Sequence, residues 1–225
     1  IYTKKDYLMD EKEKQSQEKK KMSAGQVIVE YGQAIALAII LALIVRSFVI
    51  QAFQIPSGSM IPTFLEGDRV LVSKFAYGIR NPFNNKVWID TGRPERWDVV
   101  IFIYPEDKKK DFVKRVVGLP GETVSMVNGE LYINGKHMPD PHGRYDERIG
   151  GGAGRSFRPV TVGQNEYFMM GDNRDHSSDS RYWGTVDFSL LRGKAWRLYW
   201  SWDSSDPEKG FTKRLRTSRI GTKIE

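Results

Sequence analysis

The hydrophobic pattern of the chain changes character near residue 50. Positions 34–45, AIALAIILALIV, are uninterrupted apolar residues, and apolar flanks extend the stretch from Val27 to Phe53. A membrane-spanning helix needs about 20 residues, so this stretch is long enough to cross the hydrocarbon core. Glu30 and Arg46 lie near its two ends, where long side chains can reach the membrane surface. The pattern therefore predicts one transmembrane anchor, which we assign to residues 26–52.

Two other interpretations of this stretch compete with a retained anchor. The central apolar run alone would suit a buried core helix, and a cleavable signal peptide has a similar apolar segment. A long polar tail ahead of the segment, and no small-x-small cleavage pattern soon after it, favour retention. Lysines are frequent in that tail, and lysine marks the cytoplasmic side. We expect residues 1–25 to be a basic cytoplasmic tail and the remainder to lie on the extracytoplasmic face of the cytoplasmic (inner) membrane.

Beyond the anchor, short runs of β-strand pattern are separated by turn residues. The clearest runs are DRVLV, VVIFIY, FVKRVVG, ETVSMV, NEYFMM and LLRGKAWRLYW. Asn134–Gly135 predicts a hairpin turn, whereas residues 81–98 have the composition of a loop. Many short strands at this spacing predict a mainly β, barrel-like antiparallel domain. We expect two parts, residues 53–123 and 167–225, around a small β insertion at 124–166, which contains GGGAG.

Tryptophans add one expectation about the last strand. Trp196 and Trp200 alternate along it, and core packing is the role we expect for them, with the membrane interface as the alternative.

Composition narrows the chemistry further. The chain has no cysteine, which excludes disulfides, thiolate nucleophiles and cysteine-bound metals. Its net charge of +7 is spread out, and no recognition helix, zinc finger or aromatic RNA-binding signature is present, so nucleic-acid binding is not expected. The three histidines show no metal-binding spacing. No metal or cofactor is expected.

The stretch QIPSGSMIPT directly follows the anchor and carries two hydroxyls. Pro56 and Gly58 keep its backbone out of a regular helix, so Ser57 and Ser59 lie in a turn with accessible amides. Such a turn suits acyl transfer, but linkers have the same composition. A serine nucleophile needs a base, and His176 is one candidate because catalytic triads are recognised by geometry rather than by order.

Lys114 is the other candidate for the base. The pKa of a lysine is ordinarily about 10.4, and apolar burial can lower it toward neutrality. Phe112, Val113, Val116 and Val117 bracket Lys114 on a predicted strand. Strand periodicity alone favours a lysine that points outward into solvent.

Three segments taken in order resemble the signature boxes of the type I signal peptidases (leader peptidases). They are IPSGSMIPTFLEGDRVLVSK, KRVVGLPGE and MGDNRDHSSDSRYWG. This family consists of membrane-anchored Ser–Lys endopeptidases that remove signal peptides from exported preproteins after small residues. The resemblance implies that Ser59 is the nucleophile and Lys114 the general base. It also implies that the Ser59 backbone N–H and the Ser57 hydroxyl stabilise the oxyanion.

The resemblance implies further roles for residues around this pair. Ser177 would orient the lysine and Asp179 would lie nearby, paired with Arg181, while Arg115 and Asp172 would form a second structural ion pair. Shallow apolar pockets for small substrate residues would be lined by Ile55, Pro56, Met60, Phe64, Phe112 and Val113. His176 stands where many members carry a polar amide, so on this interpretation it is not catalytic. Signal peptides of preproteins and membrane lipid are the expected partners.

Other functions remain open at this stage. One is a specialised Ser–Lys maturation protease or a self-cleaving repressor-like protein, although the latter needs a DNA-binding domain where this chain has an apolar segment. Another is a catalytically silent, membrane-tethered β-domain that binds partners. The presence of both Ser59 and Lys114 favours the enzyme.

Overall fold

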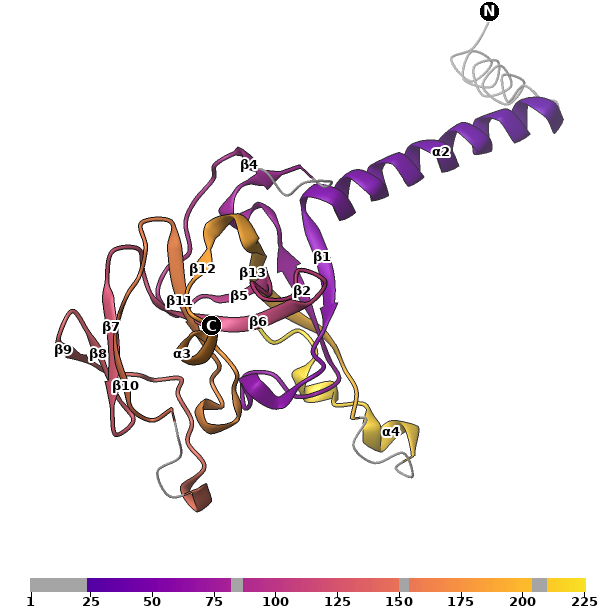
Figure 1. Cartoon of the computed structure of the whole chain (residues 1–225). Helices are drawn as coiled ribbons and strands as arrows, with labels where there is room; N and C mark the ends of the chain where they lie inside the picture. The colour runs from indigo at the N-terminus through magenta and orange to yellow at the C-terminus, as the bar shows by residue number, and fades with distance from the viewer. Residues whose placement is uncertain (1–23, 82–86, 150–153, 204–209) are drawn as a thin grey trace, which may run out of the picture. The chain divides into compact units, whose positions relative to one another are not determined.

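The computed structural model describes residues 24–81, 87–149, 154–203 and 210–225, and it divides into two units, residues 1–44 and 45–225 (Figure 1). The predicted tail at residues 1–25 therefore lies almost wholly outside the described residues, as does most of the GGGAG run. One long helix, α2, extends from Ala24 to Phe48.

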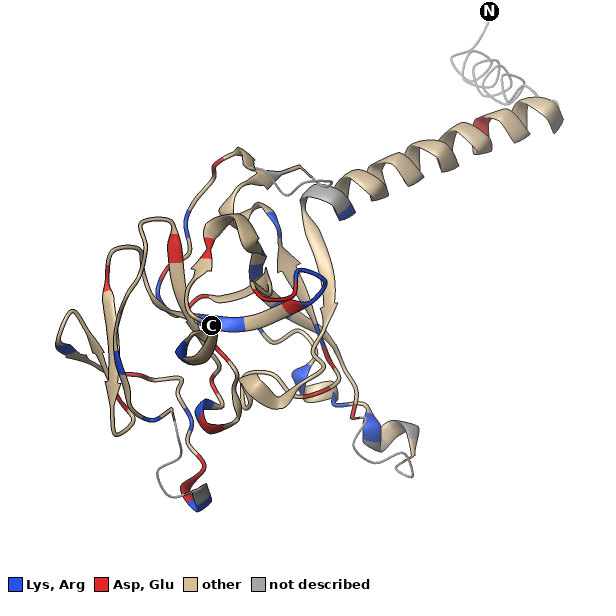
Figure 2. Cartoon of the chain, in the orientation of Figure 1, with Lys and Arg blue, Asp and Glu red and all other residues tan. Residues whose placement is uncertain are grey.

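Helix α2 is apolar on all sides. Its only charged residues are Glu30 and Arg46, near opposite ends (Figure 2). The 22 residues Gly25–Arg46 are long and apolar enough to cross a membrane, and none of this helix is buried inside the protein. A helix that is hydrophobic all round needs an apolar environment, so this one is consistent with membrane anchoring.

Seven strands form one antiparallel sheet in the order β1-β2-β13-β5-β6-β11-β12. These strands are β1 (Ile50–Gln54), β2 (Asp68–Ser73), β5 (Val99–Ile103), β6 (Asp111–Gly118), β11 (Glu166–Met170), β12 (Val186–Asp187) and β13 (Leu191–Ser201). The predicted mainly β antiparallel fold with one N-terminal apolar helix is confirmed. Strand β1 is an edge strand, so one side of it is open to further pairing.

Both faces of this sheet are buried along β5 and β6, which explains the continuous apolar runs of these two strands. Along β5, Val99 and Ile101 pack into one core cluster, while Val100 and Phe102 pack into a second cluster on the opposite face. A strand covered on both faces is apolar throughout rather than alternating.

Four shorter strands form a second sheet in the order β10-β7-β8-β9. They are β7 (Thr123–Val127), β8 (Glu130–Ile133), β9 (Lys136–Met138) and β10 (Phe157–Thr161). Asn134 and Gly135 join β8 to β9 with φ of 52° and 75°, so the predicted hairpin turn is confirmed. The sheet has its own apolar cluster, which also includes Phe168 and Met170 of β11. That residues 124–166 form a separate insertion stays a prediction.

Short helical segments complete the described residues. They are η1 (Gly58–Met60), η2 (Phe75–Tyr77), η3 (Glu147–Ile149), η4 (Arg174–His176), α3 (Ser180–Trp183), η5 (Phe188–Leu190), α4 (Phe211–Arg214) and η6 (Thr217–Arg219).

Two expectations from the sequence were wrong. Within the predicted loop at residues 81–98, β4 (Val87–Ile89) pairs with β3 (Ile79–Arg80). Strand β4 is only three residues long and all three are exposed, so it lacks the length and alternation that indicate a strand. Trp196 is 45% exposed rather than in the core. Register shifts in β13 near Ala195 and Leu198 break the alternation, so those two residues turn inward and Trp196 turns out.

Candidate active site

The two predicted serines lie in the turn between β1 and β2. Ser57 has extended backbone dihedrals and precedes η1, in which Ser59 is 9% exposed. The two hydroxyl oxygens are 3.4 Å apart. Met60 and Phe64 are fully buried in the core cluster beneath, and they hold the turn against the sheet.

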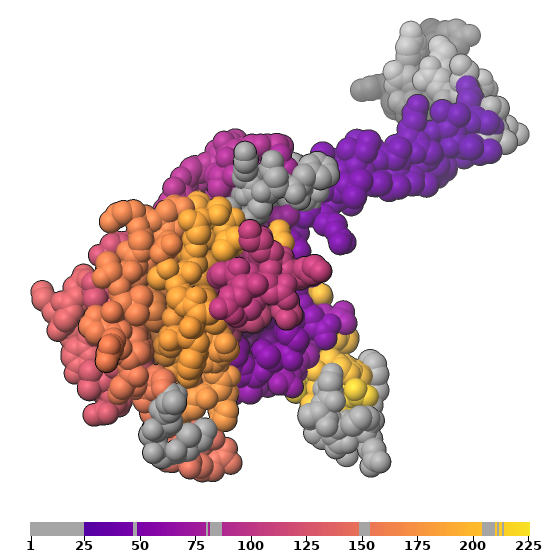
Figure 3. All heavy atoms as spheres, in the orientation of Figure 1, coloured from indigo at the N-terminus to yellow at the C-terminus, as the bar shows by residue number. Residues whose placement is uncertain are grey.

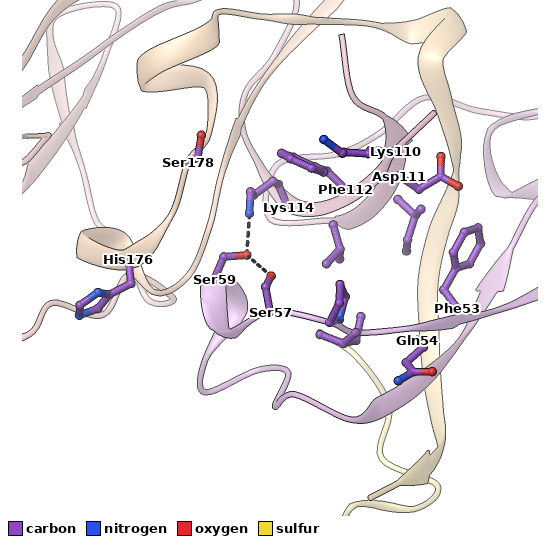
Figure 4. A pocket seen from close by; sticks show the side chains of 14 residues that line it. Phe53, Gln54, Ser57, Ser59, Lys110, Asp111, Phe112, Lys114, His176 and Ser178 are labelled. Carbon is purple, nitrogen blue, oxygen red and sulfur yellow. Dashed lines mark hydrogen bonds between the residues drawn. The ribbon is translucent and has the colours of Figure 1, made fainter. Parts of the chain in front are cut away.

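Lys114 approaches this turn from β6, a central strand of the sheet. It is 4% exposed, and its Nζ donates a hydrogen bond of 2.6 Å to Ser59 Oγ (Figure 4). The alternative of a lysine that points into solvent is therefore wrong. Burial lowers the pKa of Lys114 to about 8, the negative charge of Asp179 opposes that effect, and the positive charge of Arg181 adds to it.

A third segment, residues 171–183, follows β11 and holds the turn of Ser57 and Ser59 in place. Figure 3 shows magenta atoms beside orange to yellow-orange atoms from the later part of the chain and purple atoms from its earlier part, so segments far apart in the sequence meet on this face. The Asn173 backbone N–H donates to Ser59 O at 3.1 Å, and its side-chain Nδ2 donates to Gly58 O at 3.0 Å. Sequence reasoning gave Asn173 no role, although it is part of the GDN run of the third box.

Gly171 allows a close approach of the same two segments. A Cβ built at this position would lie 2.2 Å from Ser177 Oγ and 2.5 Å from the Ser59 carbonyl oxygen. Ser177 is buried here, and its hydroxyl has no hydrogen-bond partner among the described residues. The structure thus places Ser177 beside the site, but without the hydrogen bond to Lys114 that the resemblance implies.

Both ion pairs implied by the resemblance are present and buried. Arg115 donates two hydrogen bonds of 2.8 Å to the carboxylate of Asp172. Arg181 donates to the Asp179 carboxylate at 2.7 and 2.8 Å. Asp179 also accepts the Gly171 N–H at 3.0 Å. Bidentate pairs of this kind fix geometry, so the Arg115–Asp172 pair sets the position of the third segment against β6, whereas the Arg181–Asp179 pair fixes the conformation within that segment.

A cavity of about 460 Å³ opens beside Ser59 and Lys114. Four of the predicted substrate-binding residues line it, namely Ile55, Pro56, Phe112 and Val113, together with Phe53 and Gln54 of the edge strand β1 (Figure 4). Met60 and Phe64 do not line this cavity, because both side chains are directed into the core. The cavity therefore has an apolar wall, formed by Phe53, Ile55, Pro56, Ile101, Phe112 and Val113, beside the polar groups of Ser57, Ser59 and Lys114.

His176 borders the cavity but is not directed at the serine. Its side chain is 53% exposed, its Nε2 lies 3.5 Å from the Asp146 carboxylate, and in Figure 4 its ring points away from Ser59 and Lys114. This geometry does not favour His176 as the base. Across the described residues, no group of three or more His, Asp and Glu side chains is arranged to hold a metal ion.

Comparison with known proteins places these features in a family. The family model for "Signal peptidase, peptidase S26" matches residues 28–200. A signal peptidase I from Pseudomonas fluorescens is 38% identical over 234 residues, which cover 89% of this chain and 81% of that protein. A signal peptidase I from Pseudomonas aeruginosa is 37% identical, with the same coverage of 89% and 81%. A solved signal peptidase I from Enterococcus faecalis is 30% identical, covers 47% of this chain and 98% of its own, and has a TM-score of 0.39.

The family match extends from within α2 to the end of β13, so it includes Ser59, Lys114 and the third segment. The chain belongs to the signal peptidase family, peptidase S26, a family of serine peptidases.

Proposed function

We propose that this protein cleaves N-terminal signal peptides from exported preproteins by means of a Ser59–Lys114 dyad. The observation that carries the proposal is the 2.6 Å contact between Lys114 Nζ and Ser59 Oγ, in a buried setting that lowers the pKa of the lysine to about 8. A base must lie within hydrogen-bond reach of the proton it removes and must be partly unprotonated near neutral pH. Lys114 meets both requirements.

Acylation follows from this arrangement. Neutral Lys114 accepts the proton of Ser59 Oγ while that oxygen attacks the carbonyl carbon of the scissile peptide bond. The tetrahedral intermediate collapses, the C–N bond breaks, and the Lys114 ammonium gives its proton to the leaving amine. The products of this step are an acyl-enzyme on Ser59 and the free amino terminus of the mature protein.

The oxyanion needs donors close to the nucleophile. Ser57 Oγ is 3.4 Å from Ser59 Oγ and can turn its hydroxyl toward the oxygen of the intermediate. With the Ser59 backbone N–H it forms the pair of donors that we assign to this role. In deacylation, Lys114 accepts a proton from water while the water oxygen attacks the ester carbonyl. The bond between the acyl carbon and Ser59 Oγ then breaks, the Lys114 ammonium returns its proton to Ser59 Oγ, and the signal peptide leaves with a free carboxyl terminus.

The substrate chain is expected to lie along the open side of β1. An extended peptide can add to an edge strand through main-chain hydrogen bonds and place alternate side chains in pockets. Phe53 and Gln54 of β1 and Phe112 and Val113 of β6 line the cavity next to Ser59. Apolar walls at this position favour small apolar residues before the cut, in the pattern of A-x-A sites.

Anchoring completes the proposal. Helix α2 would cross the cytoplasmic membrane with residues 1–25 on the cytoplasmic side, because the lysines of that tail favour this orientation. The catalytic unit would then lie on the extracytoplasmic face, where signal peptides emerge.

The test is cleavage of a preprotein by the full chain in detergent, alongside four variants. Ser59→Ala and Lys114→Ala should lose activity by several orders of magnitude. The matched controls, Ser125→Ala in β7 and Lys136→Ala in β9, lie in the smaller sheet and should keep it. Full activity of Lys114→Ala at neutral pH would contradict the dyad.

A further inference from the structure

A second cavity, of about 480 Å³, lies beside the same serine turn. Its lining includes Ile61 and Pro62, which follow the turn, and Asn173, which holds the turn. His176 lines both this cavity and the one that contains Ser59 and Lys114. In Figure 4, His176 lies on the side of Ser59 opposite Phe53 and Gln54. A chain that passes from β1 across Ser59 therefore continues toward the second cavity.

The backbone beside this cavity is fixed relative to the nucleophile. Arg144 N donates to Asp172 O at 2.7 Å, and Arg174 N donates to Arg144 O at 2.9 Å. Asn173 lies between Asp172 and Arg174 in the chain, and its backbone N–H donates to the carbonyl oxygen of Ser59. Arg144 is thus attached to the same short segment that holds the serine. Such attachment reduces the ordering cost of binding a ligand here.

The side chain of Arg144 has hydrogen-bonding capacity to spare. Its guanidinium donates to the carbonyl oxygens of Pro141 and Gly143, at 3.0 and 2.9 Å. A guanidinium carries five N–H donors. In residues 24–81, 87–149, 154–203 and 210–225, no carboxylate forms an ion pair with Arg144. Arg144 can therefore bind a carboxylate without breaking an existing ion pair.

The charged side chains that line the cavity give it a net positive charge. Arg148 is 90% exposed and pairs with Asp146 at 2.8 Å, and the same carboxylate lies 3.5 Å from His176. Two arginines thus face one carboxylate among the residues that line the cavity. The arrangement attracts an acidic side chain and repels a basic one.

We propose that this second cavity binds the first residues of the mature protein, those that follow the cleaved bond, and that it favours an acidic side chain there. The inference rests on the proposed function, because the position of the cut defines which residues reach the cavity. Arg144 is assigned as the main contact and Arg148 as a weaker, solvent-screened one.

The test uses peptides that share an Ala-x-Ala end to the signal segment and continue with Ala-Glu, Ala-Gln or Ala-Lys. For the full chain in detergent at low salt, kcat/KM should fall from Glu to Gln to Lys by about two- to fivefold at each step. In Arg144→Gln the differences in kcat/KM among the three peptides should become smaller, and in the double variant with Arg148→Gln they should disappear. Arg158→Gln, at an exposed position of β10, is the matched control and should keep the order. Equal kcat/KM values for the three peptides in the unmodified enzyme would overturn the proposal, as would an unchanged order in the double variant.

A binding measurement separates failure of this proposal from failure of the proposed function. Ser59→Ala enzyme is titrated with the same three peptides carrying a fluorescent label, and anisotropy reports affinity without cleavage. Tighter binding of the Glu peptide than of the Lys peptide, lost in Ser59→Ala/Arg144→Gln, supports the cavity even if no peptide is cut. Equal affinities overturn it, whatever the activity of the unmodified enzyme.

Discussion

Lys114 Nζ lies 2.6 Å from Ser59 Oγ, and only 4% of the lysine is exposed. Burial disfavours the ammonium, so the pKa of Lys114 falls from 10.5 to about 8, even though the charge of Asp179 acts in the opposite direction. At pH 7 about a tenth of such lysines are neutral, and at pH 9 about nine tenths are. In the proposed dyad, the contact would activate the serine, and the burial of Lys114 would set the dependence of that activation on pH.

Activity should rise with pH in step with this titration. With neutral Lys114 as the proposed base, we expect kcat/KM to increase about tenfold between pH 7 and pH 9, with a midpoint near 8. The measurement is the pH profile of kcat/KM for a preprotein or peptide in detergent. A flat profile across this range would mean that the lysine is not the titrating base.

Asp179→Asn should move that profile to lower pH. The negative charge of Asp179 raises the pKa of Lys114, and the positive charge of Arg181 lowers it. Removing the carboxylate withdraws the first effect and leaves the charge of Arg181 opposed only by the smaller effect of Asp172, so the midpoint should fall. Asp107→Asn, on the turn between β5 and β6, is the control and should leave the midpoint in place. An upward shift in Asp179→Asn would contradict the assigned electrostatics.

Lys114→Met should be more stable than the unmodified protein, although inactive. The folded-state pKa of about 8 lies below the unfolded value of 10.5, so the folded state resists protonation at a cost of roughly 3 kcal/mol below pH 8. Methionine fills a similar volume without charge. We expect the free energy of unfolding to rise by on the order of 1 to 3 kcal/mol at pH 7. Since the lysine is neutral in both states above 10.5, the gain should shrink between pH 8 and pH 10.5.

Chemical denaturation in detergent at pH 7 and at pH 10 provides this comparison. Lys136→Met, on the exposed side of β9, is the matched variant and should change stability little at either pH. A loss of stability in Lys114→Met at pH 7 would show that the hydrogen bond to Ser59 outweighs the cost of burying the ammonium.

Much of the fold followed from local pattern, and the failures have a local cause. The runs around β5 and β6 were recognisable because both faces of the sheet are buried, and Asn134–Gly135 marked its turn because it adopts positive φ. Trp196 was misassigned because a register shift in β13 interrupts the alternation, and nothing in the residue types announces such a shift. Strand β4 was missed because an exposed three-residue strand has no hydrophobic signature.

In the candidate site too, some features could be predicted from the sequence and others depend on contacts that only the fold creates. Periodicity alone favours a Lys114 that points outward into solvent, and only the family resemblance pairs it with Ser59, the residue that its Nζ contacts in the fold. Asn173 was overlooked because its partners are backbone carbonyls, which carry no mark in the sequence. The second cavity lies where the backbones of Arg144 and Ser59 both form hydrogen bonds with the segment around Asn173. Only the fold brings these segments together.

Asn173→Ala should lower kcat by about three- to tenfold with little change in KM. The substitution removes the Nδ2 hydrogen bond to Gly58 O but keeps the backbone bond to Ser59 O, and one such bond contributes about 0.5 to 1.5 kcal/mol. Asn165→Ala, which removes an exposed hydrogen bond to Asp187, is the control and should leave both constants unchanged. If Asn173→Ala raised KM and left kcat unchanged, the residue would act in substrate binding rather than in positioning the turn.

Gly171→Ala should damage the site by displacing Ser59. The added Cβ would lie 2.5 Å from the Ser59 carbonyl oxygen, a backbone atom that cannot move without shifting the nucleophile, and 2.2 Å from Ser177 Oγ. Overpacking of this kind costs about 1 to 3 kcal/mol, and a displaced nucleophile loses its alignment with Lys114. We therefore expect a loss of stability in that range, measured by denaturation, and a fall in kcat/KM of at least about a hundredfold. Gly210→Ala, where a Cβ would meet no atom within 4 Å, should change neither quantity. Normal activity in Gly171→Ala would mean that the third segment can withdraw from the serine turn without cost, and that the close approach at Gly171 does not position the dyad.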